Sequence, residues 1–208
     1  PTLTVNGLLE FPETLRTMPF IYLGDKDAAE NLTIDLYGDF KMMDAANAYS
    51  YADINFLGAG VQDVQYVSGT INYGDWTVNS AAAVVIQQTD LTLGANTDLN
   101  VINGTWSFEE DTPADLVVEG NLTVEPDGVI SCTRSSVYID ATDHLNDTGT
   151  GRTIIVNGTL TVIGSIEATG NGFGTGDGPA GYKAGIGNYL WGATHAGRGG
   201  FNGTTDRY

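Results

Sequence analysis

Apolar and polar side chains alternate over many short stretches of this chain, a pattern typical of β-strands that bury one face. These stretches are rich in β-branched and aromatic residues, which favour extended backbone, and Gly, Asn and Asp separate them as turn formers. Residues 41–51 carry a weaker helical pattern, for which we expect one short helix or a loop. The pattern predicts an all-β chain, with its clearest strands at residues 33–37, 53–57, 76–78, 83–86, 91–93 and 137–139.

One strand-length sequence occurs twice. Residues 116–124 (Leu-Val-Val-Glu-Gly-Asn-Leu-Thr-Val) return at residues 154–162 as Ile-Ile-Val-Asn-Gly-Thr-Leu-Thr-Val, and looser copies lie at residues 3–11, 66–73 and 101–108. Internal repeats of this length are typical of stacked rather than closed folds. The glycines of the copies are 35, 16 and 38 residues apart, which fits a coil of about 16 to 19 residues with unmatched coils in the gaps; these are Gly69, Gly104, Gly120 and Gly158.

The repeats favour a parallel β-solenoid from about Val61 to Gly170, in which apolar side chains stack from coil to coil. An antiparallel β-sandwich is the alternative, because Asn-Gly between short strands also marks hairpins. The solenoid is preferred since strands of a sandwich differ from one another in sequence. Its predicted core contains Val118, Leu122, Val124, Val156, Leu160 and Val162.

Composition divides the chain into three regions. We expect residues 1–60 to form a β-rich region that caps the solenoid or exchanges strands, and residues 61–169 to form the solenoid itself. Residues 170–208 form a segment rich in Gly and aromatic residues, with 13 of the 28 glycines falling within residues 170–203. A stretch with this much glycine loses much conformational entropy when it becomes ordered. We therefore expect it to pack on a larger assembly or to continue into one.

The charge balance limits the partners. The 208 residues include 26 acidic and 8 basic side chains, for a net charge of −18. Nucleic acid is therefore not an expected partner, because no basic cluster is present to neutralise phosphates. No apolar run is long enough to span a membrane. Ample aromatic residues argue against disorder.

Glycosylation signals point to an extracellular chain. Cys132 is the only cysteine, so no internal disulfide is expected. The two ends of the sequence suggest a processed chain or a fragment. Asn-x-Ser/Thr is the acceptor pattern for N-linked glycans. The sequence Asn-Gly-Thr can also arise at solenoid corners without glycosylation, because Asn-Gly favours turns and Thr favours strands. The six candidate acceptors are Asn31, Asn103, Asn121, Asn146, Asn157 and Asn202.

Candidate chemistry is sparse. Asp140, Asp143 and Asp147 gather carboxylates that could contribute to a calcium site, but they lack the closing Glu and the Gly of an EF-hand. Glu119, Asp127 and Glu167 are nominal candidates for the paired carboxylates of polysaccharide hydrolysis. The glycine-rich segments lack the context of a phosphate-binding loop, and no nucleophile has a partnered base. We therefore expect no catalytic activity.

Residues 116–130 and 154–166 resemble the coils of right-handed parallel β-helix proteins, the pectin-lyase-like and adhesin-type cell-surface group. The Gly-rich stretch at residues 192–200 is similar to segments of large surface proteins of that kind. The resemblance implies an extracellular structural or adhesive role, as a building block of a filament, sheath or adhesin joined to copies of itself or to other surface proteins. The alternative is a carbohydrate-binding or carbohydrate-cleaving β-helix in which aromatic residues of the Gly-rich segment stack on sugars.

Overall fold

The computed structural model describes residues 1–12, 21–24, 32–43, 48–109, 114–132 and 153–167. All regular elements in these ranges are β-strands, and no helix occurs among them. The prediction of an all-β chain is confirmed. The weakly helical segment instead contributes to strands β5 (Phe40–Met42) and β6 (Ala48–Ser50). Residues 44–47 and the strand expected at residues 137–139 lie outside the described residues.

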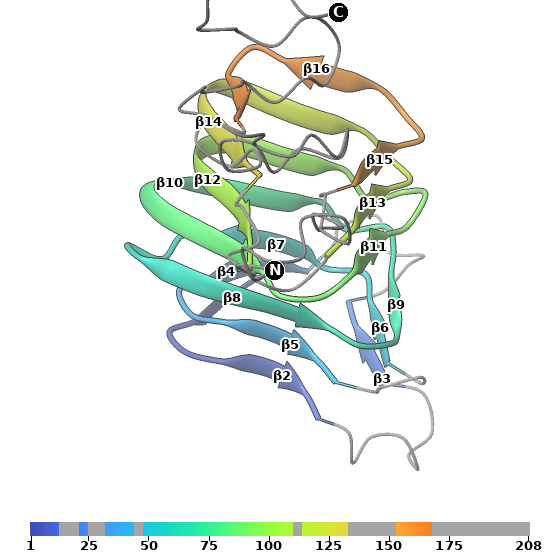
Figure 1. The fold of residues 1–208 in the computed structure, drawn as a ribbon. Helices are drawn as coiled ribbons and strands as arrows, with labels where there is room; N and C mark the ends of the chain where they lie inside the picture. Colours follow the sequence, from blue (N-terminus) through green and yellow to red (C-terminus); the bar gives the residue numbers. More distant parts are fainter. Residues whose placement is uncertain (13–20, 25–31, 44–47, 110–113, 133–152, 168–208) are drawn as a thin grey trace, which may run out of the picture.

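The chain passes through three groups of strands in turn, which we call the first, second and third arms (Figure 1). The first arm is a run of seven strands in an eleven-stranded sheet, in the order β1-β4-β7-β10-β12-β14-β16. Its strands are β1 (Thr2–Val5), β4 (Thr33–Leu36), β7 (Asp53–Phe56), β10 (Trp76–Gln87), β12 (Leu99–Phe108), β14 (Leu122–Ser131) and β16 (Leu160–Val162).

The second arm belongs to the same sheet. Its separate strands are β2 (Leu9–Phe11), β5 (Phe40–Met42), β8 (Val61–Tyr66) and β17 (Ser165–Glu167). The long strands β10, β12 and β14 serve both arms: β10 pairs with β7 through its first residues and with β8 through its last. Shifts in register where these strands bend mark the corner between the two arms.

The third arm consists of two three-stranded sheets, on the side of the molecule opposite this bend (Figure 1). The first sheet contains β3 (Ile21–Leu23), β6 (Ala48–Ser50) and β9 (Thr70–Ile71). The second contains β11 (Leu91–Leu93), β13 (Leu116–Val118) and β15 (Ile154–Val156). We call one passage of the chain through the arms a unit.

Every strand pair in the described ranges is parallel. The antiparallel sandwich is therefore wrong. The two copies of the repeat lie directly against each other, since Leu116 is the register partner of Ile154 and Leu122 that of Leu160. Sequence similarity here reflects strands that are neighbours in a sheet.

The spacing between units differs from the expected 16 to 19 residues. Thr33 and its register partner Asp53 are 20 residues apart, and Trp76 and its partner Leu99 are 23 apart. The expectation failed because the glycines lie at different corners: Gly69 between β8 and β9, Gly104 within β12, and Gly120 between β13 and β14. Parallel pairing also includes β1, β4 and β7 in the same sheet, so it starts well before Val61.

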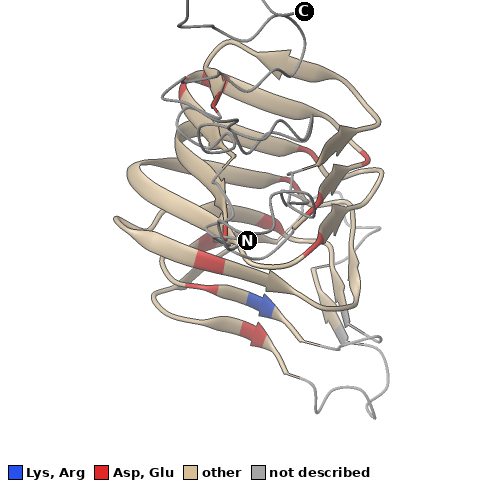
Figure 2. Cartoon of the chain, in the orientation of Figure 1, with Lys and Arg blue, Asp and Glu red and all other residues tan. Residues whose placement is uncertain are grey.

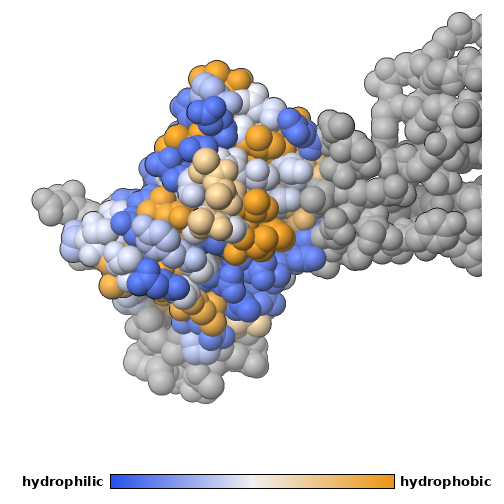
Figure 3. Space-filling view, turned by 90° about the vertical axis from the view of Figure 1, so that its left-hand side faces the viewer, coloured by the Kyte–Doolittle hydropathy of each residue, from blue (hydrophilic) through white to orange (hydrophobic). Residues whose placement is uncertain are grey.

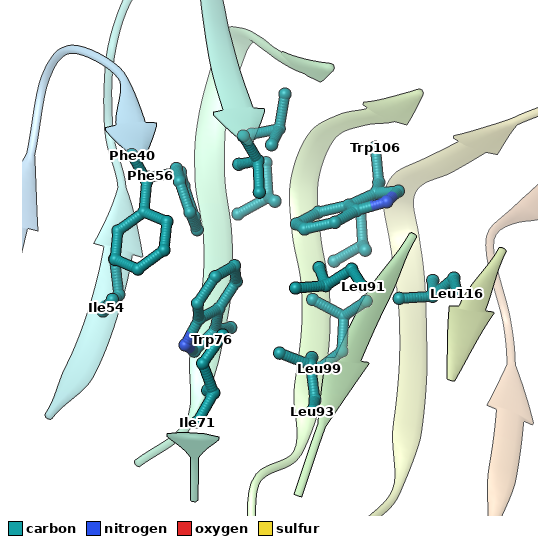
Figure 4. Packing of buried hydrophobic residues seen from close by; sticks show 14 of the residues in the cluster. Phe40, Ile54, Phe56, Ile71, Trp76, Leu91, Leu93, Leu99, Trp106 and Leu116 are labelled. Carbon is teal, nitrogen blue, oxygen red and sulfur yellow. The ribbon is translucent and has the colours of Figure 1, made fainter. Parts of the chain in front are cut away.

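The core runs through the middle of the stack, between the arms (Figure 4). Its largest side chains pack edge-on or tilted against one another: Phe40 and Trp76 at 4.9 Å between ring centroids, and Phe56 and Trp106 at 6.1 Å. Such aromatic contacts add to the free energy gained from burying the rings. Leucine, isoleucine and valine from successive units continue the core on both sides.

Only half of the predicted core is buried. Val118, Leu122 and Val124 are completely buried. Val156 is half-buried, whereas Leu160 and Val162 are 51% and 43% exposed. These last residues belong to the final described unit, and no further described strand covers them.

Glycine allows the units to approach closely at the corners. A Cβ atom on Gly158 would lie 2.3 Å from the carbonyl oxygen of Gly120, and one on Gly120 would lie 2.4 Å from that of Thr97. Both distances are far below van der Waals contact. The glycine of the repeat is therefore required by the unit stacked beneath it.

Candidate functional site

The two ends of the stack have unpaired strand edges. At one end, strands β1, β2 and β3 each pair on one side only; we call them the N-terminal edge. At the other end, strands β15, β16 and β17 do the same and form the C-terminal edge (Figure 1). Both statements concern pairing within the described ranges. Open edges of this kind present backbone N–H and C=O groups that can pair with another strand.

Side chains in core register are exposed at both edges. Leu3 of β1 is 46% exposed, although its register partner Ile34 is completely buried. At the other end Ile166 of β17 is 41% exposed, and its partner Ile130 is completely buried. The core positions are thus covered in the middle of the stack and open at its ends.

A ladder of side chains follows one corner, before the first arm. It consists of Asp53, Asp75, Asp98 and Asn121, which we call the aspartate ladder. Each accepts a hydrogen bond from a backbone N–H of the next unit: Asp75 N–H donates to Asp53 at 3.0 Å, and Asp98 N–H donates to Asp75 at 3.1 Å. The series continues through Asn121, whose Oδ1 accepts from the N–H of Thr159 at 2.9 Å.

The middle of this ladder concentrates negative charge. Burial raises the pKa of the Asp75 carboxyl above its ordinary value, while the hydrogen bond from Asp98 N–H opposes the rise and the Asp98 and Asp53 carboxylates add to it. The charged form of this carboxyl is therefore less favourable in the folded chain than in water, and the effect is modest because Asp75 is partly open to solvent. The ladder binds the units through acceptor oxygens at an electrostatic cost.

A group of tyrosines lies beside the strands β3 and β6. Tyr22 and Tyr49 are stacked with ring centroids 5.3 Å apart, Tyr51 stacks on both, and Tyr73 meets Tyr51 edge-on. We call these four residues the tyrosine cluster. Tyr22 is 56% exposed, so the cluster offers ring surface to solvent.

The charged surface of the described ranges is almost entirely acidic (Figure 2). Lys41 is the one basic side chain there, opposite Glu10 in the pairing of β2 with β5. On the side where the long strands bend, apolar residues form small groups separated by hydrophilic ones (Figure 3). This side thus differs from the ends, where exposed apolar side chains coincide with open strand edges.

Three of the six candidate glycan acceptors lie in the described ranges. Asn121 and Asn157 are exposed, and Asn103 is half-buried within β12. The amide of Asn121 donates to Asp98 at 3.0 Å, and that of Asn157 donates to Glu119 at 2.8 Å. Asn121 and Asn157 therefore have a structural role at the corners. The remaining candidates, Asn31, Asn146 and Asn202, lie outside the described residues.

The candidate carboxylates lie on separate elements. Glu119 follows β13, Asp127 lies at the bend of β14, and Glu167 ends β17; all three are exposed. Glu167 accepts a hydrogen bond from the Ser165 hydroxyl at 3.0 Å. No trio of His, Cys, Asp or Glu with metal-site geometry occurs in the part of the chain that the structure describes. The calcium candidates Asp140, Asp143 and Asp147 lie outside it.

The aspartate ladder and two buried glutamines were not predicted from the sequence. Gln62 donates to the carbonyls of Leu36 and Gly38, and accepts from Gly58 N–H. Gln87 donates in the same way at another corner. The ladder had a detectable signal in the sequence, because its members are 22 to 23 residues apart, which is the distance between the units that they join.

The described ranges hold no helix of the length and apolarity needed to cross a lipid bilayer. Comparisons with protein-family models, with curated proteins and with solved structures find no match to this chain.

Proposed function

We propose that the chain is a parallel β-solenoid, with each unit forming one coil, and that it is a building block of an extracellular filament, sheath or adhesin. The observation that carries the proposal is the state of its two ends. Open strand edges and exposed core-register side chains occur together there. A stack of this kind favours association with copies of itself or with other surface proteins, because a covering unit would bury the exposed side chains.

The lateral surface suits such a role. Its acidic side chains keep neighbouring copies apart sideways and maintain solubility, while the ends carry the apolar contacts. The resemblance of the repeats to β-helix surface proteins supports the same placement. Glycans on exposed sequons such as Asn121 and Asn157 would fit an extracellular location.

Negative-stain electron microscopy of material from the native source tests the proposal. Regular polymers are the expected result, and uniformly monomeric particles would contradict it. Intact-mass measurement of the same material tests the location. We expect a mass above that of the bare polypeptide, and a bare mass would remove the glycans from the proposal.

The proposal assigns no catalytic activity to the chain. A screen for cleavage of acidic and neutral polysaccharides, with and without calcium, tests this. We expect no turnover above background. Turnover that disappears in a Glu119→Ala, Asp127→Ala or Glu167→Ala variant would overturn the assignment.

A second candidate function is carbohydrate binding, which the tyrosine cluster favours. Aromatic rings that are partly exposed provide apolar surface on which sugar rings can stack. Saccharide binding measured by calorimetry should then be weakened by Tyr22→Ala. Tyr37→Ala is the matched control, because Tyr37 is 46% exposed and lies outside the cluster; equal losses in both variants would exclude the cluster as the site.

A further inference from the structure

We propose that copies of this chain join head to tail, with β1 of one copy pairing in parallel with β16 of the next and β2 pairing with β17. The inference rests on the proposed function and deepens it by naming the contact and its register. The partner is a second copy of this chain.

The two edges carry the same sequence. Residues 2–10 read Thr-Leu-Thr-Val-Asn-Gly-Leu-Leu-Glu, and residues 159–167 read Thr-Leu-Thr-Val-Ile-Gly-Ser-Ile-Glu. Six of the nine positions are identical, and a seventh pairs Leu9 with Ile166. The similarity covers the strand of the first arm, the corner and the strand of the second arm. The first and last described units are therefore versions of one structural element.

Strands with this sequence already stack on each other within the chain. Leu-Thr-Val of β14 (residues 122–124) pairs in register with Leu-Thr-Val of β16 (residues 160–162). The tripeptide occurs at one other place in the sequence, residues 3–5 of β1. Placing β1 against the free side of β16 would repeat the observed pairing, with Leu3 on Leu160 and Val5 on Val162. It would cover side chains that are now 46%, 51% and 43% exposed at Leu3, Leu160 and Val162.

The corner glycines fit the same arrangement. Within the chain, a Cβ on Gly38 would lie 2.4 Å from the carbonyl oxygen of Gly7, and a Cβ on Gly164 would lie 2.2 Å from that of Glu125. Each of these glycines faces the unit before it. Gly7 occupies the same position in its unit, yet a Cβ there would meet nothing within 4 Å. Glycine at this position is explained if a preceding unit is supplied by the C-terminal edge of another copy.

The contact has one unfavourable feature. The register that places Leu3 on Leu160 also places Glu10 beside Glu167, and like charges directly opposite each other on neighbouring strands repel. The net charge of −18 adds to this repulsion. Association is therefore expected to strengthen with ionic strength, because salt screens repulsion between exposed charges.

A segment of the same chain is the competing occupant of the C-terminal edge. Residues 168–208 follow β17 but contain no Leu-Thr-Val sequence. The two copies of the tripeptide in β14 and β16 already pair with each other. This leaves β1, at the opposite end of the stack, as the matching strand for the free side of β16, and geometry allows it to reach β16 only from another copy.

Sedimentation velocity of the full chain over a range of concentrations and salt tests the contact, with Gly7→Ala as the test variant. Gly60→Ala is the matched control, because a Cβ on Gly60 also meets nothing within 4 Å and Gly60 lies between β7 and β8, away from both edges. At a dilution where the chains are monomeric, both variants should unfold at the wild-type temperature. We expect wild type and Gly60→Ala to form oligomers that grow with concentration, and Gly7→Ala to associate about ten- to a hundredfold more weakly.

A charge variant at the same contact should strengthen association, whereas Gly7→Ala should weaken it. Glu167→Lys should strengthen association at low salt, because it would place a cation beside Glu10 of the next copy. A wild-type chain that remains monomeric at all concentrations, or a Gly7→Ala variant that associates as wild type does, would overturn the head-to-tail contact. If native material contains polymers but Gly7→Ala associates as strongly as wild type, only this contact is rejected. The absence of polymers in native material would reject the proposed function.

Discussion

Residues 122–124 in β14 and residues 160–162 in β16 have the same sequence, Leu-Thr-Val, and pair with each other in register, yet they differ in burial. Leu122 and Val124 are completely buried, whereas Leu160 and Val162 are 51% and 43% exposed. The difference comes from their places in the stack: β14 lies between β12 and β16, and β16 has a described neighbour on one side only.

This comparison shows that the alternating pattern specifies which side chains point toward the core, and that the next unit determines whether they are covered. In a stack of units, burial depends on neighbours rather than on the sequence of the strand itself. An end at which core-register side chains have no covering strand within the described ranges is therefore suited to the addition of one more unit.

The largest expected effect comes from truncating the same leucine in the two strands. Leu122→Ala should lower the free energy of unfolding by about 2 to 5 kcal/mol, because it leaves a cavity in a packed core. Leu160→Ala should cost less than about 1 kcal/mol when measured on dilute monomer, since half of the side chain already faces solvent. Urea unfolding followed by circular dichroism measures both, and equal losses would show that the two positions are equally buried in solution.

Corner glycines should show the next effect. Gly120→Ala brings a methyl group against the carbonyl of Thr97 and should destabilise the monomer by about 1 to 3 kcal/mol. Gly60→Ala should leave the stability within about 0.5 kcal/mol of wild type, since its added methyl meets open space. Thermal unfolding of the two variants is sufficient for the comparison. Similar melting temperatures would indicate that units are less closely stacked than the structure shows.

The smallest effect concerns the aspartate ladder. Because the pKa of Asp75 is raised in the folded state, folded protein binds more protons than unfolded protein as the pH rises above 3.8, the ordinary value. The free energy of unfolding therefore falls as the pH passes through the raised pKa. Asp75→Asn retains an acceptor for Asp98 N–H and removes the charge, so it should reduce this fall and stabilise the protein by a few tenths of a kcal/mol at about pH 7.

The control for this variant is Asp127→Asn, which removes an exposed acid away from the ladder. Urea unfolding between pH 4 and about 7 gives both pH profiles. If the free energy of unfolding of Asp75→Asn falls with pH as steeply as that of wild type, the pH dependence does not come from Asp75.

Much of the strand content could be predicted from the sequence. The strands β4, β7 and β11 lie where alternation places them, and the repeat identified two strands that are true neighbours. The spacing of the units could not be obtained from the glycines, because Gly104 and Gly120 belong to different corners. Residues 133–152 also lengthen one unit, so that Leu122 and its partner Leu160 are 38 residues apart.

The candidate site was less accessible to sequence analysis. Exposure at Leu160 and Val162 cannot be distinguished from burial at Leu122 and Val124 by their identical sequences. The similarity of residues 2–10 to residues 159–167 was present in the sequence. It indicates a contact between copies only because the two segments lie at opposite ends of the stack. The aspartate ladder shows the reverse case, since its spacing alone could have supplied the distance of 22 to 23 residues between the units that it joins.

The most direct test of the account is the axial rise per subunit in polymers of this chain, measured by cryo-electron microscopy. One copy contributes seven strands to the first arm, and neighbouring strands in a sheet lie about 4.8 Å apart, so head-to-tail stacking in register predicts a rise of about 34 Å per copy. A polymer with this rise and continuous strand spacing across the joint is the expected result. A rise that leaves a gap or an additional layer between copies, or contacts made through the lateral acidic surface, would contradict the account.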